Sequence, residues 1–227
     1  MQKIPKIIHY CWFGRNPKPD LVLKCIASWH KHLPDYKFIE WNEDSFDLNI
    51  NNYAKQAYEC KKWAFVTDYV RLYALKTHGG IYLDSDVEVF KNLDKFLVHS
   101  AFSGFENFKG TLSPITAVMG SEKEGSWVSN LLSGYNNKNF IIGNKMDLTT
   151  NTKTITSQLI NEYQIKVDDS YQVVGDDIHI YTSNYFCNDS SNSYALHHFN
   201  GSWIPTGQKF LSKIKRFLLS IIGKGNK

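Results

Sequence analysis

The chain has 227 residues, of which 42% are hydrophobic and 15% aromatic, with a formal net charge of +4. This length suits one large folded domain, and the 21% charged fraction with a mean hydropathy of -0.37 excludes an intrinsically disordered chain. No apolar run approaches the roughly 18 to 20 residues that a membrane-spanning helix needs. The apolar patch at residues 1–12 is too short and too aromatic for a secretory signal peptide.

Cysteine usage indicates a reducing compartment. Cys11, Cys25, Cys60 and Cys187 show neither CxxC spacing nor the density of a disulfide-rich protein. We therefore expect buried, inert thiols rather than disulfides or a zinc site built from cysteines. A cytoplasmic location follows as an expectation.

The hydrophobic pattern predicts alternating strands and helices. Strands are expected at 6–12, 36–41 and 81–83, and helices at 21–33, before Pro34, and at 53–77, before Gly79-Gly80. Residues 110–151, rich in Gly, Asn, Ser and Thr, are expected to form loops around a short helix at 126–132. Short strands at 171–174, 178–181 and 194–198 and a last helix at 210–222 complete the pattern, which predicts an α/β fold with a mostly parallel sheet.

Two carboxylates, Asp84 and Asp86, follow the apolar strand predicted at 81–83. Side chains at this spacing, just past a strand, lie at the edge of the sheet where α/β folds form ligand clefts. Such a pair can hold Mg²⁺ or Mn²⁺ together with substrate phosphates. The structural alternative is an Asx turn, which an isolated pair of aspartates would favour.

Asp68 and Arg71 lie three residues apart and share a face of the preceding helix. Because that helix ends just before the strand, it can deliver both side chains close to Asp84. Arg71 offers a planar fork to a phosphate or a pair of sugar hydroxyls, and Asp68 can accept hydrogen bonds from hydroxyls. The structural alternative is a surface ion pair worth less than about 1 kcal/mol.

Several runs of the sequence together resemble one enzyme family. The runs 64–75 (AFVTDYVRLYAL) and 78–86 (HGGIYLDSD) are similar to the glycosyltransferase sugar-binding region containing the DXD motif. This region is the signature of family-32 retaining glycosyltransferases, which include bacterial capsular polysaccharide enzymes and yeast mannosyltransferases. The resemblance extends, in order, to 4–14 (IPKIIHYCWFG), 41–44 (WNED) and 197–203 (HHFNGSW).

The resemblance implies a GT-A fold, a Rossmann-like nucleotide-sugar-binding domain, which we assign to residues 1–207. It implies a nucleotide-sugar donor, with UDP favoured over GDP, and Mn²⁺ or Mg²⁺ as cofactor. Asp86 would ligate the metal, and Asp84 would face the ribose and the metal shell. Asp68 and Arg71 would hold the donor sugar, as the matching pair does in the related clostridial glucosylating toxins.

Further donor contacts follow from the same resemblance. Trp12 would stack on the nucleotide base, a role that its flat face suits, and Tyr82 would help to position the nucleotide. His198 would be the third metal ligand, as in related retaining GT-A enzymes. His197 is the competing choice because adjacent strand residues point to opposite faces. Ser202 and Trp203 would close over the diphosphate, although Trp203 also suits a core position.

The predicted activity is therefore metal-dependent, retaining transfer of a hexose to a glycan or lipid-linked glycan of a bacterial surface polysaccharide. The polar stretch 149–158 is the candidate acceptor contact. A sugar nucleotidyltransferase is the alternative enzyme, but residues 11–14 do not supply the Gly-rich phosphate loop that it needs. A carbohydrate-binding module is the non-enzymatic alternative, and it would not need these four charged residues together. Glycoside hydrolysis is disfavoured because its two carboxylates flank the bond.

Residues 208–227 carry the basic excess. They hold six basic and no acidic side chains, so the net charge of +4 becomes −2 for residues 1–207. Apolar residues recur at helical spacing over 210–222, with lysines and Arg216 on the other side. Such an amphipathic helix either docks on the domain or lies in a membrane interface. We favour peripheral contact of 209–222 with the inner face of the plasma membrane, and we exclude nucleic acid as a partner.

Overall fold

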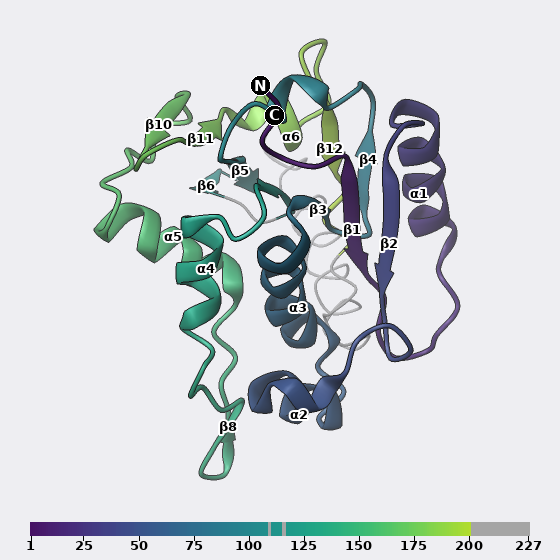
Figure 1. The fold of residues 1–227 in the computed structure, drawn as a ribbon, viewed down its shortest axis with the longest axis vertical. Coiled ribbons are helices and arrows are strands. Elements are labelled where there is room, and N and C mark those ends of the chain that lie inside the picture. The colour runs from purple at the N-terminus through teal and green to yellow at the C-terminus, as the bar shows by residue number, and fades with distance from the viewer. Residues whose placement is uncertain (109, 115–116, 201–227) are drawn as a thin grey trace, which may run out of the picture.

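The computed structural model describes residues 1–108, 110–114 and 117–200, which form a mixed α/β structure. Its eight-stranded main sheet has the order β10-β11-β5-β7-β3-β1-β2, with β6 paired to β5 (Figure 1). Strands β1, β2, β3, β5 and β11 run in one direction, and β6, β7 and β10 in the other. The strands are β1 (Ile7–Cys11), β2 (Lys37–Trp41), β3 (Gly80–Leu83), β5 (Ala101–Phe108), β6 (Thr111–Pro114), β7 (Val118–Ser121), β10 (Gln172–Val174) and β11 (Ile178–Tyr181). The predicted α/β fold is confirmed.

The first three strands create the point where a ligand cleft is expected. Strand β1 leads through helix α1 (Asp20–His32) to β2 on one side. The chain then passes through helices α2 (Asn52–Glu59) and α3 (Trp63–His78) to β3, which pairs with β1 on its other side. In α/β sheets, ligands bind outside the carboxyl ends of the strands where the strand order reverses in this way.

Each face of the sheet carries its own core. Helix α3 packs on one face, with Val66, Val70 and Tyr82 in the same buried cluster. Helix α1 packs on the other, with Trp29 and Ile81 in a second cluster. Neighbouring residues of β3 thus alternate between the two cores, and all four of its residues are buried. Strand β3 is therefore held firmly between the two cores, and it fixes the position at which the DXD motif, Asp84 to Asp86, leaves the sheet.

Two elements expected from the sequence differ in the structure. The helix predicted at 53–77 is two helices, because the chain leaves the helical conformation at Lys61, where φ is 55°. The loops predicted over 110–151 contain strands β6 and β7, and the latter pairs between β3 and β5 inside the sheet. Gly120 weakens the strand signal of this segment in the sequence, and a glycine stands here because a Cβ would collide with the ring of Phe102.

The remaining elements complete the description. The short helix predicted at 126–132 is α4 (Ser126–Ser133), whereas α5 (Asn151–Asn161) and strand β5 were not expected. Helix α6 covers Ser183–Phe186, short 3-10 helices occupy Leu48–Ile50 and Asp94–Phe96, and β8 (Ile141–Ile142) and β9 (Lys145–Met146) form a hairpin. The strand predicted at 194–198 is β12 (Ala195–His197), which pairs antiparallel with β4 (Val87–Val89) in a separate two-stranded sheet.

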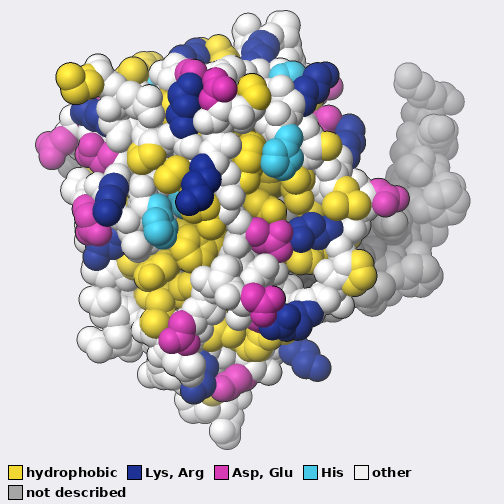
Figure 2. Space-filling model, turned by 45° about the vertical axis from the view of Figure 1, so that its right-hand side comes forward, with side chains coloured by type: hydrophobic (Ala, Val, Ile, Leu, Met, Phe, Trp, Pro, Cys, Tyr) yellow, Lys and Arg dark blue, Asp and Glu magenta, His cyan; other side chains and the backbone are white. Residues whose placement is uncertain are grey.

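The helix predicted at 210–222 lies outside the described residues, so that helix and the division at residue 207 stay predictions. Among the described residues, none of the helices combines the length and the hydropathy needed to cross a membrane. On the face drawn in Figure 2, Lys and Arg side chains are interspersed with Asp and Glu side chains. That face therefore lacks the continuous basic surface that nucleic-acid binding requires.

Candidate active site

The turn between α3 and β3 sets the geometry of the site. Gly79 and Gly80 have φ angles of 64° and 115°, which residues with a side chain rarely adopt. A Cβ on Gly80 would lie 2.6 Å from the carbonyl oxygen of Ile7 in the neighbouring strand. The buried ring of His9 fastens the turn, since its Nε2 lies 2.8 Å from the carbonyl oxygen of Gly79. The turn thus lets α3 run back directly beside β3.

Arg71 joins the helix to the DXD motif. Its Nη2 lies 3.3 Å from Oδ1 of Asp68 and 3.3 Å from Oδ1 of Asp84. Asp68 and Arg71 are each only 6% exposed. The alternative of a surface ion pair is therefore wrong, because solvent barely reaches either side chain. A buried cation between two carboxylates is a costly arrangement that a binding site explains better than stability does.

Tyr82 supports this arrangement from inside the sheet. Its ring lies under the guanidinium of Arg71, with 4.7 Å between the guanidinium carbon and the ring centroid. Its hydroxyl donates a hydrogen bond of 2.8 Å to Oδ1 of Asp84. Burial, together with the charge of Asp84, raises the pKa of Tyr82 well above its ordinary value, so the phenol keeps its proton. In this structure Tyr82 therefore orients Arg71 and Asp84.

Asn151, a residue that the sequence did not single out, completes the surroundings of Asp68. Its backbone N–H donates to Oδ2 of Asp68 at 2.9 Å, and its side-chain Nδ2 donates to the backbone carbonyl of Asp68 at 3.1 Å. Asn151 is 1% exposed, and among the described residues its Oδ1 has no hydrogen-bond partner. Burial raises the pKa of Asp68 to about 6, despite the opposing effect of Arg71. Oδ1 of Asn151 is therefore an unused hydrogen-bond acceptor, and it lies beside the carboxyl group of Asp68, whose pKa is about 6.

Asp86 is fixed by the last residue of β12 and the segment that follows it. The pairing of His197 with Val87 brings the C-terminal segment beside the DXD motif. Oδ2 of Asp86 accepts the backbone N–H of Asn200 at 2.8 Å, and its Oδ1 lies 3.4 Å from Nε2 of His197. Burial alone would raise the pKa of Asp86, but these partners bring it below its ordinary value. Asp86 is therefore a carboxylate at neutral pH.

The two adjacent histidines point to different partners. His197 lies between Asp86 and Glu106, and its Nδ1 is 2.7 Å from Oε1 of Glu106. His198 turns away, with its Nε2 2.8 Å from Oε2 of Glu88. The geometry therefore brings His197 to the DXD carboxylates, and His198, our first choice as metal ligand, does not join them. The reason is the alternation of side chains along β12.

The DXD aspartates and His197 fit a divalent cation. One ligand atom from each of Asp84, Asp86 and His197 falls within 4.8 Å of the others. Two carboxylates and an imidazole suit Mn²⁺ better than Mg²⁺, which prefers oxygen ligands alone, and diphosphate oxygens of a substrate would complete such a site. Burial by itself would lower the pKa of His197. The hydrogen-bonded carboxylates of Asp86 and Glu106 outweigh burial and raise this pKa to about 10. A bound cation would therefore replace the imidazole proton, as metal ligation requires.

The predicted base-stacking residue lies at the same edge of the sheet. Trp12 directly follows β1, which runs parallel to β3 with His9 opposite Tyr82. Its indole N–H donates to the backbone carbonyl of Asn16 at 2.7 Å, and the side chain is half-buried. Ser202 and Trp203 lie outside the described residues, so their roles at the diphosphate stay predictions.

The sequence of this segment matches a known family. Residues 19–103 match the family described as "Glycosyltransferase sugar-binding region containing DXD motif". The match includes α3, the Gly79–Gly80 turn and both DXD aspartates. This part of the chain is therefore similar to glycosyltransferase sugar-binding regions. The resemblance recognised from the sequence motifs is thereby confirmed.

Curated relatives are similar to part of the chain. Inositol phosphoceramide mannosyltransferase 3 of Schizosaccharomyces pombe is 31% identical over 107 residues, which are 44% of this chain and 29% of the relative. A glycosyltransferase of Acanthamoeba polyphaga mimivirus is 35% identical over 104 residues, 41% of this chain and 40% of the relative. The chain thus spans less than half the length of either relative.

Solved structures extend the likeness of fold beyond the sugar-binding region. A glycosyltransferase involved in the glycosylation of the major capsid of PBCV-1 has a TM-score of 0.51 at 14% identity, covering 88% of this chain and 95% of its own. The PaToxG glycosyltransferase has a TM-score of 0.52 at 19% identity, covering 71% of this chain and 70% of its own. The predicted GT-A fold is confirmed for the described residues.

Proposed function

We propose that this protein is a metal-dependent, retaining glycosyltransferase. It moves a hexose from a nucleotide-sugar, with UDP as the favoured nucleotide, to a glycan or lipid-linked glycan of a bacterial surface polysaccharide. The supporting observation is the position of Arg71, buried between Asp68 and Asp84, beside the candidate metal ligands Asp84, Asp86 and His197. A binding module that only held sugars would not need a buried cation next to a cation site.

The donor sugar is proposed to lie against Asp68, Arg71 and Asn151. Oδ1 of Asn151 is buried without a partner among the described residues, and a buried acceptor of this kind costs about 1–3 kcal/mol unless a ligand satisfies it. A sugar hydroxyl would donate to it, while the carboxylate of Asp68 accepts from a neighbouring hydroxyl. Arg71 would donate to the anomeric side of the donor. The base would stack on Trp12, and Ser202 and Trp203 would cover the diphosphate.

The proposed reaction is a displacement on one face of the sugar. Asp84, Asp86 and His197 would hold the divalent cation, which when bound would supply charge stabilisation for the departing diphosphate. Arg71 adds a fixed positive charge from a buried position, where it acts more strongly than in water. The acceptor oxygen forms a bond to the anomeric carbon from the side that the diphosphate leaves, and the acceptor proton passes to the departing phosphate oxygen. No nucleophilic side chain is assigned, so a trapped covalent glycosyl-enzyme would contradict this mechanism.

A hollow between α4 and α5 is the proposed acceptor site. It has a volume of about 520 Å³, and its lining includes the hydroxyls and amides of Asn130, Ser133, Thr149, Thr154, Ser157 and Gln158. Oε1 of Gln158 is buried, with no hydrogen-bond partner among the described residues. Asn151, at the start of α5, links this helix to Asp68. The polar stretch 149–158, the candidate acceptor contact of the sequence, supplies Thr149, Thr154, Ser157 and Gln158 to the lining of the hollow.

The proposed setting is the cytoplasmic face of the membrane. The name of the fungal relative describes mannosyl transfer to inositol phosphoceramide, a lipid. An acceptor embedded in a membrane would give the basic segment 209–222 a function, because such segments bind anionic headgroups. The expected result is loss of binding to anionic vesicles when residues 208–227 are deleted. Unchanged binding would contradict membrane contact through this segment but not the transferase activity.

A donor screen tests the activity itself. The full chain is incubated with UDP- and GDP-sugars in Mn²⁺, in Mg²⁺ and in chelator, and release of the nucleoside diphosphate is measured. We expect hydrolysis of one donor in Mn²⁺ or Mg²⁺, lost in chelator and in Asp86→Asn but kept in Asp35→Asn, an exposed control. Formation of a nucleotide-sugar from a sugar phosphate would indicate the nucleotidyltransferase. Oligosaccharide binding without hydrolysis of any donor would indicate the binding module.

A further inference from the structure

A second group of metal-ligating side chains lies at the opposite edge of the sheet from the DXD motif. His99 precedes β5, and Asp177 and His179 lie at the start of β11. Strands β5 and β11 are parallel to each other, so these residues gather at their amino-terminal ends. The DXD aspartates follow the carboxyl end of β3, which runs in the same direction. The His99–Asp177–His179 group is therefore separate from the candidate active site.

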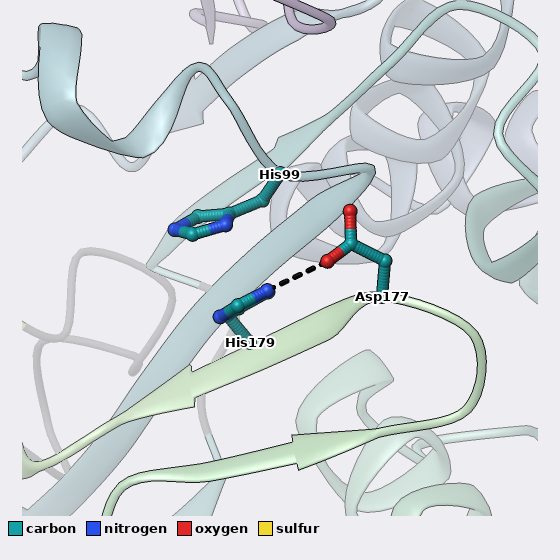
Figure 3. Close-up of side chains that lie close together, drawn as sticks. All are labelled: His99, Asp177 and His179. Carbon is teal, nitrogen blue, oxygen red and sulfur yellow. Dashed lines mark hydrogen bonds and ion pairs between the residues drawn. The ribbon is translucent and has the colours of Figure 1, made fainter.

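The three side chains lie close together. One ligand atom from each residue lies within 4.8 Å of the others. Nε2 of His179 is 2.7 Å from Oδ1 of Asp177, and the rings of His99 and His179 are stacked with centroids 3.5 Å apart (Figure 3). Two charged imidazolium rings would repel each other at this distance. Burial and the neighbouring His179 lower the pKa of His99 to about 4, in agreement with a neutral ring.

Outer hydrogen bonds orient each ligand. The hydroxyl of Tyr181 lies 2.8 Å from Nε2 of His99, and that of Tyr171 lies 2.6 Å from Nδ1 of His179. His99 therefore offers Nδ1, and His179 offers Nε2. The other carboxylate oxygen of Asp177 accepts from Nζ of Lys3 and from the backbone N–H of Ser100, both at 2.8 Å. Metal sites are usually supported in this way: the second ring nitrogen of each histidine has a hydrogen-bond partner, and the second carboxylate oxygen accepts hydrogen bonds.

We propose that His99, Asp177 and His179 form a binding site for a divalent metal ion such as Zn²⁺. Two imidazole nitrogens and one carboxylate oxygen match the ligands that Zn²⁺ takes, and water fills its fourth position. The side chains are only partly buried, and a cavity of about 110 Å³ lined by Ser100, Asp176 and Asp177 adjoins the group. Water therefore has access to the carboxylate.

Binding would replace the hydrogen bond between His179 and Asp177. Nε2 of His179 faces Oδ1 of Asp177, and its Nδ1 faces the hydroxyl of Tyr171. With Zn²⁺ at Nε2, the ring proton would be held on Nδ1 beside Tyr171. Because an imidazole binds a metal ion in the plane of its ring, one of the two stacked rings has to turn so that Nδ1 of His99 and Nε2 of His179 point at the same ion. The bound ion would join the loop before β5 to β11, and through Lys3 and Asp177 it would also hold the first residues of the chain.

The experiment measures Zn²⁺ alone on the full chain, after treatment with chelator, by equilibrium dialysis and by titration calorimetry. Asp86→Ala serves as the background, because it removes the other candidate cation site. We expect one Zn²⁺ per chain in this background, bound at least about tenfold more weakly after His99→Gln or His179→Gln. His30→Gln, on the exposed face of α1, is the matched control and should bind as the background does.

Two further measurements keep the proposal testable if a ligand variant fails to fold. Tyr181→Phe keeps all three ligands and should weaken Zn²⁺ binding by about 10- to 100-fold. Co²⁺ in place of Zn²⁺ should give the visible absorption of a low-symmetry site in the Asp86→Ala protein. An Asp86→Ala protein that binds no Zn²⁺, or folded His99→Gln and His179→Gln proteins that bind it unchanged, would overturn the proposal. Neither result would bear on donor hydrolysis, which uses the DXD motif.

Discussion

Nη2 of Arg71 lies 3.3 Å from Oδ1 of Asp84, so a residue in the middle of α3 is joined to the first aspartate of the DXD motif. The two are thirteen positions apart in sequence and meet because Gly79 and Gly80 reverse the chain within a single turn. Asp84 thus lies between two sites of positive charge: the guanidinium of Arg71 and the candidate cation site. This one carboxylate therefore connects Arg71, which is proposed to contact the donor sugar, with the cation proposed to bind the donor diphosphate.

Replacing Arg71 tests this link. Arg71→Lys keeps the positive charge but removes the planar fork that reaches both Asp68 and Asp84. We expect kcat/KM for donor hydrolysis to fall by about 10²- to 10³-fold, the usual effect of removing one donor that stabilises a developing charge. Arg15→Lys, at an exposed ion pair with Asp44, should be neutral. Arg71→Ala leaves the buried carboxylate of Asp68 without its cation and should lower the free energy of unfolding by about 3–5 kcal/mol.

The DXD aspartates should differ in their effects. Asp86→Asn removes a carboxylate held by His197 and Asn200, and we expect loss of Mn²⁺-dependent activity with little change in melting temperature. Asp84→Asn also removes the partner of Arg71 and Tyr82, so it should lower both activity and stability. Activity against Mn²⁺ concentration and thermal unfolding separate the two. Equal destabilisation by both variants would contradict this assignment.

The two histidines provide a direct comparison. His197 contacts Asp86, whereas His198 contacts Glu88, which also pairs with Lys24. We expect His197→Asn to raise the Mn²⁺ concentration needed for half-maximal activity by at least about tenfold, and His198→Asn to leave it nearly unchanged. The measurement is donor hydrolysis over a Mn²⁺ series. The reverse pattern would return the third ligand to His198, as the sequence resemblance implied.

Much of the site was predictable because its residues stand in two short runs. Asp68, Arg71, Asp84 and Asp86 are separated only by a helix end and a four-residue strand, so local rules place them together. His197 comes from a distant segment, and its position depends on the register of β12 against β4. A shift of one residue in this register would exchange the faces on which His197 and His198 lie. The sequence left His197 and His198 open for that reason.

Asn151 and strands β6 and β7 were not predictable in the same way. Asn151 meets Asp68 across 83 positions, and its only local signal is the cap from Thr150, whose side chain accepts from the N–H of Lys153. Strand β7 has four residues, with Gly120 and Ser121 among them, and it became a strand because β3 and β5 flank it on both sides. Tertiary pairing, not propensity, decides such a segment.

The proposed acceptor hollow is tested by Gln158. Gln158→Leu keeps the size of the side chain but removes the buried, unsatisfied Oε1 from the wall between α4 and α5. We expect the KM for the glycan acceptor to rise by about tenfold, in line with the loss of one hydrogen bond. Hydrolysis of the donor in the absence of acceptor is the internal control and should not change. A lower rate of hydrolysis would instead place Gln158 on the donor side.

The buried carboxyl of Asp68 should govern the acid side of the pH profile. Burial raises its pKa to about 6, so it is protonated below that pH and cannot accept two hydrogen bonds from sugar hydroxyls. We therefore expect kcat/KM for donor hydrolysis to rise with pH through about 6 and to level off above it. Because the folded protein binds this proton more tightly than the unfolded chain, the contribution of Asp68 to the free energy of unfolding falls as pH rises from about 4 to 6. The residual activity of Asp68→Asn should lack the rise near pH 6, and a rise that persists would assign it to another group.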